Sequence, residues 1–289
     1  MGKKISQITN EESTSISDTD WFEGEESGGT SFKTAFSVIK STLKSYFDTL
    51  YLSGLAVSTA SVTTSNVTGV EGTLHNLDVS GMTANRDFNL PTPSAAGKRV
   101  GVHLSTGDDT YALIVKINSV EWSRLFITNE TVIFVSTGTG AGNWVIESDS
   151  RIPQTAQMKS TAVQSIANNT FTQMTFDTEV YDVGDIASIS TEKITVRRAG
   201  KYMITGTATF ALLDATRLII SIYINGAGYA GASLHSSFSG NLTPFVAGIF
   251  NLAAGDYIEL YILHTYGSTQ NTVASNDNTY PRLSLAEVL

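Results

Sequence analysis

The chain has 289 residues, and its 27 acidic and 18 basic side chains give a formal net charge of −9. This balance excludes the basic footprint of a nucleic-acid-binding protein and any polybasic membrane patch, and no apolar run approaches the roughly 20 residues that span a bilayer. The absence of cysteine excludes disulfides and thiolate metal sites, so stability must come from packing or assembly. With 24 glycines and only 5 prolines, the composition favours many short strands joined by polar turns.

The first 31 residues are polar and acidic. The chain starts with two lysines but no apolar h-region follows them, so we expect no secretory signal and assembly in a cytoplasm. Such a segment cannot bury enough surface to repay its ordering entropy. We therefore expect its few apolar side chains to dock on a partner, and a solvated tail is the alternative. The candidate docking residues are Ile5, Ile8, Ile16, Trp21 and Phe22.

Residues 32–50 follow Gly28-Gly29 and have an N-cap available at Thr30 or Ser31, which predicts a helix. Its apolar residues recur at alternating steps of four and three, as in a coiled-coil seam. A seam of this length is weak in water, so we expect it to pack against copies of itself or a partner; an amphipathic helix on its own domain is the alternative. The seam residues are Phe32, Phe36, Ile39, Leu43, Tyr46 and Leu50. Residues 1–52 form the predicted docking segment.

Residues 53–84 are rich in Ser, Thr and Val and contain three near-copies of a five-residue unit, each with one valine: Val57, Val62 and Val67. One valine in five cannot close a core within a single chain, whereas three chains wound together bury the valines against each other. We therefore predict a short trimeric β shaft, with these valines continuing the seam between copies. A flexible linker is the alternative.

The rest of the chain predicts two β domains: a small β module over residues 85–150 and a jelly-roll sandwich over residues 158–289. The sandwich is organised around two strands joined by the tight turn Ala253-Ala254-Gly255-Asp256. In the second strand Ile258, Leu260 and Ile262 share one face, while Tyr257, Glu259 and Tyr261 share the other. Both faces need cover, either inside a sandwich or against a neighbouring subunit. The predicted fold class is thus mainly β with one N-terminal helix.

Residue patterns that would carry chemistry are incomplete. Residues 226–231 satisfy G-x-G-x-x-G, but no helix signal follows, as a dinucleotide site requires. The four histidines lack metal or triad spacing. Turn acids at Asp182, Asp185 and Asp277 offer oxygen ligands for calcium, but without the spaced D-x-D-x-D-G loop solvated turns are favoured. We expect no enzyme activity and no cofactor, although a carboxylate pair that cleaves polysaccharide, distant in sequence, stays open.

Two long connections, residues 225–241 and 264–281, combine aromatic rings with amide and hydroxyl groups. Such side chains suit recognition of a sugar or another polar surface, and loops on a rigid sandwich are where binding usually lies. The alternative is that these loops only connect strands. The candidate receptor-binding residues are Tyr229, His235, Phe238, Tyr266, Asn271, Asn276, Asp277 and Tyr280.

Two parts of the chain resemble known families. In residues 158–289, the A-G-x-Y element at 199–202, the element at 252–260 and the closing residues 283–285 resemble the jelly-roll heads of the tumour necrosis factor and complement-type superfamily. That resemblance implies a homotrimer with strand faces buried along a three-fold axis. The order of modules in the first 150 residues, from residues 28–33 to residues 143–146, resembles bacteriophage fibre proteins.

Together these resemblances imply a homotrimeric fibre of a phage virion. Its N-terminus docks on a tail or capsid protein, and its head attaches to a glycan or protein of the host surface. The alternatives are a structural head fibre or capsid decoration protein without a dedicated receptor, and a polysaccharide depolymerase.

Overall fold

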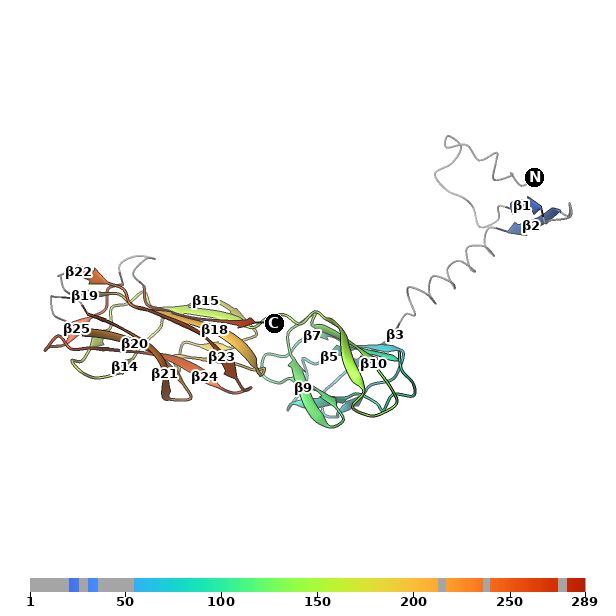
Figure 1. Cartoon of the computed structure of the whole chain (residues 1–289), viewed down its shortest axis with the longest axis horizontal. Helices are drawn as coiled ribbons and strands as arrows, with labels where there is room; N and C mark the ends of the chain where they lie inside the picture. Colours follow the sequence, from blue (N-terminus) through green and yellow to red (C-terminus); the bar gives the residue numbers. More distant parts are fainter. Residues whose placement is uncertain are drawn as a thin grey trace, which may run out of the picture.

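The computed structural model describes the backbone of residues 21–25 and 31–35, and residues 55–212, 217–235, 240–274 and 280–288. This described part is all β (Figure 1). Within it no helix is long and apolar enough to cross a membrane.

The predicted N-terminal helix is wrong where the structure describes it. Ser31–Ala35 form strand β2, which pairs antiparallel with β1, Trp21–Glu25, so that Phe32 lies opposite Gly24. Gly28-Gly29 between two segments that contain aromatic residues is a hairpin signal, which competes with the helix N-cap signal at Thr30 or Ser31. The other five seam residues, Phe36, Ile39, Leu43, Tyr46 and Leu50, lie outside the described residues, as do Ile5, Ile8 and Ile16.

Residues 55–149 form one body of two sheets, here called the module. One sheet has the order β11-β10-β7-β5-β3 and the other β4-β6-β8-β9. The strands are β3 (Ala56–Ser61), β4 (Val67–Thr68), β5 (Thr73–Asp78), β6 (Arg86–Asn89), β7 (Arg99–Thr106), β8 (Leu113–Ile117), β9 (Val120–Leu125), β10 (Thr131–Ser136) and β11 (Trp144–Asp149).

The valine repeats belong to these sheets, because β3 pairs parallel with β5, β5 with β7, and β4 with β6. Val62 is buried in a core with Phe88 and Val100, and Val67 is half-buried against it. Val57 lies exposed on the edge strand β3. A single chain thus buries Val62 with residues distant in sequence, which local spacing does not reveal.

Residues 155–288 form a jelly-roll sandwich, here called the head, which confirms the predicted β sandwich. Its front sheet has the order β15-β12-β26-β18-β23, and its back sheet β16-β17-β24-β20-β21 with β14 also on β24. The strands are β12 (Thr155–Lys159), β13 (Ser165–Ile166), β14 (Thr172–Gln173), β15 (Thr178–Val183), β16 (Ala187–Ser188), β17 (Lys193–Thr195), β18 (Gly200–Thr207), β19 (Phe210–Leu212), β20 (Arg217–Ile224), β21 (Ala227–His235), β22 (Gly240–Leu242), β23 (Phe245–Leu252), β24 (Tyr257–His264), β25 (Gln270–Asn271) and β26 (Arg282–Val288).

The core of the head lies between the two sheets. Ile258, Leu260 and Ile262 point inward from β24, as their alternation predicts, and meet Tyr202 and Ile204 of β18 in one buried cluster. The turn before β24 is also as predicted: Gly255 has a φ of 95°, and the Asp256 carboxylate accepts a hydrogen bond from the Ala253 amide at 2.7 Å.

Head and module meet end to end (Figure 1). A buried charge cluster joins them. Arg198, only 1% exposed, pairs with Glu130 of the module and, at 3.1 Å, with Glu287 of the head. Its Nε also donates to the Arg124 carbonyl at 2.8 Å. Since β26 ends at this cluster, the last described residue, Val288, lies at the junction and not at the far end of the head.

The neighbouring Arg197 adds a second set of contacts across the junction. Its guanidinium donates to the carbonyl of Gly184 in the head and to the carbonyls of Asp108 and Tyr111 in the module, at 2.7–3.0 Å. It also lies 4.1 Å from the centre of the Phe126 ring. The two adjacent arginines therefore hold head and module in one orientation.

Candidate functional site

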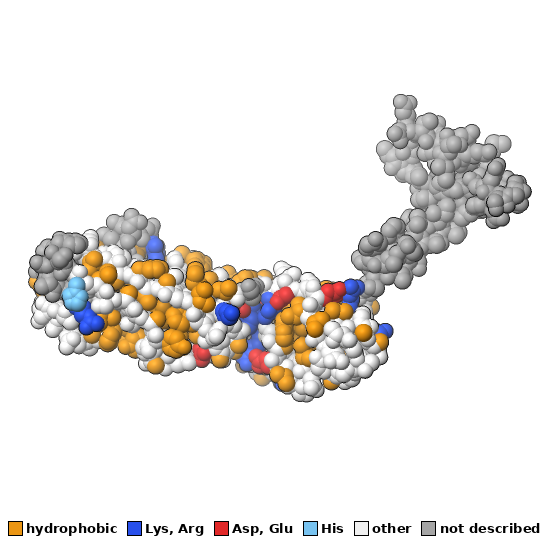
Figure 2. Space-filling model, viewed as in Figure 1, with side chains coloured by type: hydrophobic (Ala, Val, Ile, Leu, Met, Phe, Trp, Pro, Cys, Tyr) orange, Lys and Arg blue, Asp and Glu red, His pale blue; other side chains and the backbone are white. Residues whose placement is uncertain are grey.

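The outward side of the front sheet carries an uncovered apolar surface, which we call the open face. Met203 of β18 lies between Ile249 of β23 and Ala286 of β26 in the strand register, and their side chains point away from the core. Met203 is 48% exposed and Ile249 63%. The open face consists of Met203, Phe245, Ala247, Ile249, Ala286 and Val288. Hydrophobic side chains gather over the head in Figure 2.

The sequence of β23 explains why this face is apolar. Phe245–Leu252 reads FVAGIFNL, so both pleat faces of the strand carry hydrophobic residues. Val246 and Leu252 are buried in the core, which leaves Phe245, Ala247 and Ile249 outside. A contiguous exposed patch of this kind marks an interaction surface, for another protein, a membrane or a ligand. From the sequence we took strands with hydrophobic residues on both faces as a sign of a subunit contact, but we named no residue of the open face as a site residue.

The rim of the open face is polar. Gln157 donates to Ser284 at 2.8 Å, and Lys159 lies 5.1 Å from the centre of the Tyr280 ring. Tyr280, a predicted receptor-binding residue, therefore lies on the flank of the head beside β12. An apolar centre with a polar rim is the usual anatomy of a protein–protein interface.

The end of the head away from the module collects three of the predicted receptor-binding residues (Figure 1). His235 ends β21 opposite Arg217, the first residue of β20. Tyr266 and Asn271 follow β24, and Asn271 pairs with Ser165 of β13. His235 and Asn271 are exposed and Tyr266 is half-buried. We call this region the distal end. Three further predicted residues, Phe238, Asn276 and Asp277, lie outside the described part of the chain.

The buried His264 shapes the turn that carries Tyr266. Its Nε2 lies 3.0 Å from the Ile166 carbonyl oxygen, and its Nδ1 accepts a hydrogen bond from the Tyr266 amide at 3.3 Å. These partners require the proton on Nε2. His264 is thus a positioning residue of the distal end.

Tyr229 lies apart from the distal end. It precedes His235 on β21 by six residues, a separation of roughly 20 Å along a strand. Its ring contacts Phe250 of β23 edge-on, with ring centres 5.5 Å apart. Tyr229 is strongly exposed and forms, with Phe250, an apolar edge of the head next to the open face.

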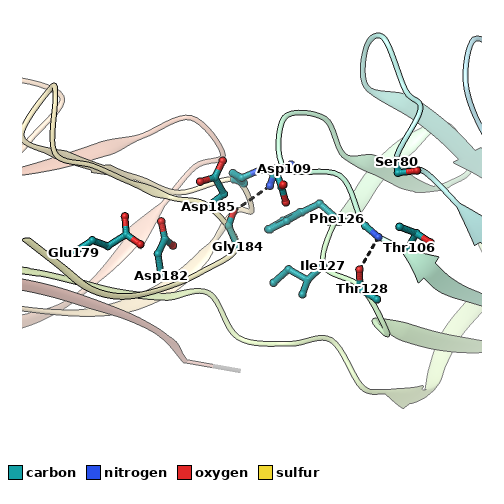
Figure 3. A pocket seen from close by; sticks show the side chains of 12 residues that line it. Ser80, Thr106, Asp109, Phe126, Ile127, Thr128, Glu179, Asp182, Gly184 and Asp185 are labelled. Atoms are coloured by element: carbon teal, nitrogen blue, oxygen red, sulfur yellow. Dashed lines mark hydrogen bonds between the residues drawn. The ribbon is translucent and has the colours of Figure 1, made fainter.

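A cavity of about 600 Å³ lies at the junction of head and module (Figure 3). Four carboxylates line it, from Asp109, Glu179, Asp182 and Asp185, and Arg197 is the basic residue of the lining. Burial and the charges of Asp182 and Asp109 raise the pKa of Asp185. Asp182 already accepts the amides of Ile186 and Ala187 at 3.0 and 2.7 Å.

Two of the three acids considered for calcium, Asp182 and Asp185, thus line one cavity. The third, Asp277, lies outside the described residues. In the part of the chain that the structure describes, no group of three or more His, Cys, Asp or Glu side chains is arranged to hold a metal ion.

No protein-family model matches this sequence, and no curated protein matches it. Among solved structures, the head is similar to the globular domain of zebrafish complement 1qA protein, at 15% identity and a TM-score of 0.37, over 47% of this chain and 98% of that one. It is also similar to murine APRIL (15% identity, TM-score 0.38, 47% and 100% of the two chains). A third similar structure is the Eiger TNF of S. frugiperda (12%, 0.35, 48% and 92%). Likeness at this level carries nothing about what this chain binds or how it assembles.

Proposed function

We propose that this chain is a homotrimeric fibre of a bacteriophage virion, which docks on the particle through its N-terminal segment and attaches to the host surface through its head. The observation that carries the proposal is the open face around Met203 and Ile249. A lone copy leaves this apolar surface in water, whereas assembly buries it.

Two different apolar surfaces favour a cyclic ring over a two-fold pair. A two-fold dimer uses the same patch on both partners, whereas a cyclic ring joins one patch to a different one. The head has both kinds of patch: the open face, and the edge formed by Tyr229 and Phe250. In the proposed ring, the edge of each copy packs against the open face of the next, consistent with the homotrimer that the sequence resemblance implies.

Adhesion is the proposed mechanism, without enzymatic turnover. The polar distal end, with His235 and Asn271 exposed, offers weak contacts to a host surface. Three heads per fibre and several fibres per particle raise avidity by about 10²–10⁴ over one contact without any new interaction. The module and the rigid junction hold the head away from the docking segment.

The first test is the mass of the purified chain in light scattering at micromolar concentration. A trimer of a 30.9 kDa chain gives about 93 kDa. Met203→Glu combined with Ile249→Glu places six carboxylates in the proposed ring and should give the monomer mass. Val120→Glu, at an exposed apolar residue of the module, is the matched control and should remain trimeric. A wild-type monomer refutes the assembly.

The second test is binding of the labelled chain to host cells and competition with infecting phage. We expect the wild type to bind and the Met203→Glu, Ile249→Glu variant to bind at least a hundredfold more weakly, because it loses avidity. A trimer that binds no host cell and leaves infection unchanged refutes the attachment role and favours the structural-fibre alternative.

A further inference from the structure

The outward side of the back sheet carries an aromatic cluster that the open face and the distal end do not include. Tyr223 of β20 and Tyr261 of β24 stack with ring centres 4.0 Å apart and planes 28° apart. Phe171, which precedes β14 and is 42% exposed, tilts against Tyr223 at 6.1 Å. We call Phe171, Tyr223 and Tyr261 the aromatic platform.

Beside the platform, strand β21 has glycine at two positions where a side chain would otherwise rise above the sheet. Gly228 of β21 lies opposite Tyr223, and Gly231 lies opposite Ser221. A Cβ atom on Gly231 would lie 2.7 Å from the Ser221 Oγ, and one on Gly228 would lie 3.4 Å from the Tyr223 ring. These glycines belong to the G-x-G-x-x-G run that has no dinucleotide role. Here they leave a flat, exposed backbone surface bordered by aromatic rings.

A buried carboxylate lies among these rings. Glu259 of β24 stands opposite Tyr223 on the outward side of the sheet, yet it is only 4% exposed, so the neighbouring side chains cover it. Its Oε1 accepts a hydrogen bond from Gln173 Nε2 at 3.2 Å and lies 3.7 Å from Lys193 Nζ. Its Oε2 is buried and has no hydrogen-bond partner among the described residues. A buried acceptor without a donor is costly.

We propose that this side of the head binds a carbohydrate, with a pyranose ring stacked on the aromatic platform and a sugar hydroxyl donating to Glu259 Oε2. The inference deepens the proposed attachment function, on which it rests, by naming the class of receptor and a site for it. The C–H face of a pyranose suits an aromatic ring, while its edge presents the hydroxyl donors that the carboxylate lacks. The Lys193 ammonium, 3.7 Å from Glu259 Oε1, is a donor for the sugar's oxygens.

Other ligand chemistries fit less well. A phosphate ester would meet the negative charge of Glu259, and Lys193 is the cation that neighbours it on this surface. A purely apolar ligand would leave Oε2 without a donor. Burial and the charge of Glu259 raise the pKa of Tyr261, so its phenol keeps its proton at neutral pH.

The test uses the full chain and an array of purified bacterial surface polysaccharides. Saturation-transfer NMR then follows with oligosaccharides cut from those polysaccharides that are retained. We expect binding by the wild type, with saturation strongest at the sugar's ring protons. Tyr261→Ala should weaken binding at least tenfold, and Phe171→Ala and Glu259→Gln at least threefold. Val120→Ala, at an exposed residue of the module, is the control and should bind like the wild type.

Several outcomes overturn the inference. One is a wild type that binds no polysaccharide; another is a folded Glu259→Gln variant and a folded Phe171→Ala variant that both bind like the wild type. A light-scattering mass that falls in Tyr261→Ala would assign the platform to a contact between copies. The outcomes also separate the two proposals. If the platform variants still bind host cells normally, the carbohydrate site fails while attachment stands, and a wild type that binds no host cells removes attachment itself.

Discussion

Replacing Arg198 by alanine is the sharpest test of how head and module are held together. The substitution removes the cation from a cluster in which Glu130 and Glu287 are both buried. Glu130 keeps its hydrogen bonds from the Phe126 and Ile127 amides, but both carboxylates lose the charge that compensates them. Head and module therefore face each other across two uncompensated buried charges.

The expected loss of stability is large. Removing one partner of a buried ion pair costs about 3–5 kcal/mol, and for a protein of this size each kcal/mol shifts Tm by about 2–4 °C. We therefore expect Tm to fall by roughly 6–20 °C. Arg124→Ala is the matched control, because its pair with Glu121 is partly exposed and such pairs contribute about 0.2–1 kcal/mol.

Differential scanning calorimetry measures both the shift and the coupling. The wild type should unfold head and module together, and Arg198→Ala should separate them into two transitions, the first at lower temperature. Replacing Arg198 by Met together with Glu130→Gln and Glu287→Gln should recover most of the loss, because no buried charge remains. If Arg198→Ala unfolds in a single transition whose Tm lies within about 2 °C of the wild-type Tm, the reasoning is refuted. Such a shift is smaller than the one expected from a loss of one kcal/mol.

Three further predictions concern packing, pH and the turn before β24. Gly107→Ala should destabilise the module by about 1–3 kcal/mol, because its Cβ would lie 2.1 Å from the Phe126 carbonyl oxygen. Gly142→Ala is the control, because a Cβ there meets nothing within 4 Å. Equal urea midpoints for the two variants would contradict the prediction. Burial raises the pKa of Asp149, but the hydrogen bonds and charge of Arg151 outweigh it and leave that pKa below its ordinary value of 3.8. The contribution of the Asp149–Arg151 pair to the free energy of unfolding is thus present above about pH 4 and lost as pH falls through the lowered pKa. The gap between the urea midpoints of the wild type and Arg151→Met should therefore narrow as the pH is lowered below that range, and a gap that widens in acid would count against the pair. Gly255→Val, at a φ of 95°, should cost about 1–2 kcal/mol of unfolding free energy, and an unchanged midpoint would show that the turn tolerates a side chain.

The sandwich was predictable because its signals are local. The alternation of Ile258, Leu260 and Ile262, and the Gly255-Asp256 turn before them, each follow from a few adjacent residues, and the structure contains both. The valine repeats lacked such a signal, since Val62 is buried in one cluster with Phe88 and Val100, which are distant from it in the sequence. The N-terminal helix failed for a different reason: helical spacing and a glycine-bounded hairpin were both compatible with residues 31–35, and β pairing with Trp21–Glu25 decided between them.

The candidate site was predicted only in part. Loop composition selected His235, Tyr266 and Asn271, which the fold brings to one end, but it also selected Tyr229, which strand β21 carries away from them. Composition cannot reveal this, because the separation depends on strand direction. Glu259 was noted for its face of β24, yet its burial and its unpaired oxygen depend on residues of other strands, which the sequence of β24 does not reveal. The sequence around Arg198 gave no signal of the buried charge cluster. Arginine before a strand is common, and its partners Glu130 and Glu287 are distant from it in the sequence.

Because β26 runs toward the junction of head and module, a label fused to the C-terminus does not mark the far end of the head. Because Val288 lies at the waist of the molecule, beside the Arg198 cluster, a fluorophore or gold particle fused after the final residue marks the middle of the projection. An imaging experiment that mistakes this mark for the tip would underestimate the length of the protein by the length of the head. An insertion in the turn at residues 265–269, which follows β24 at the far end of the head, marks the true tip, and the distance between the two labels measures the length of the head.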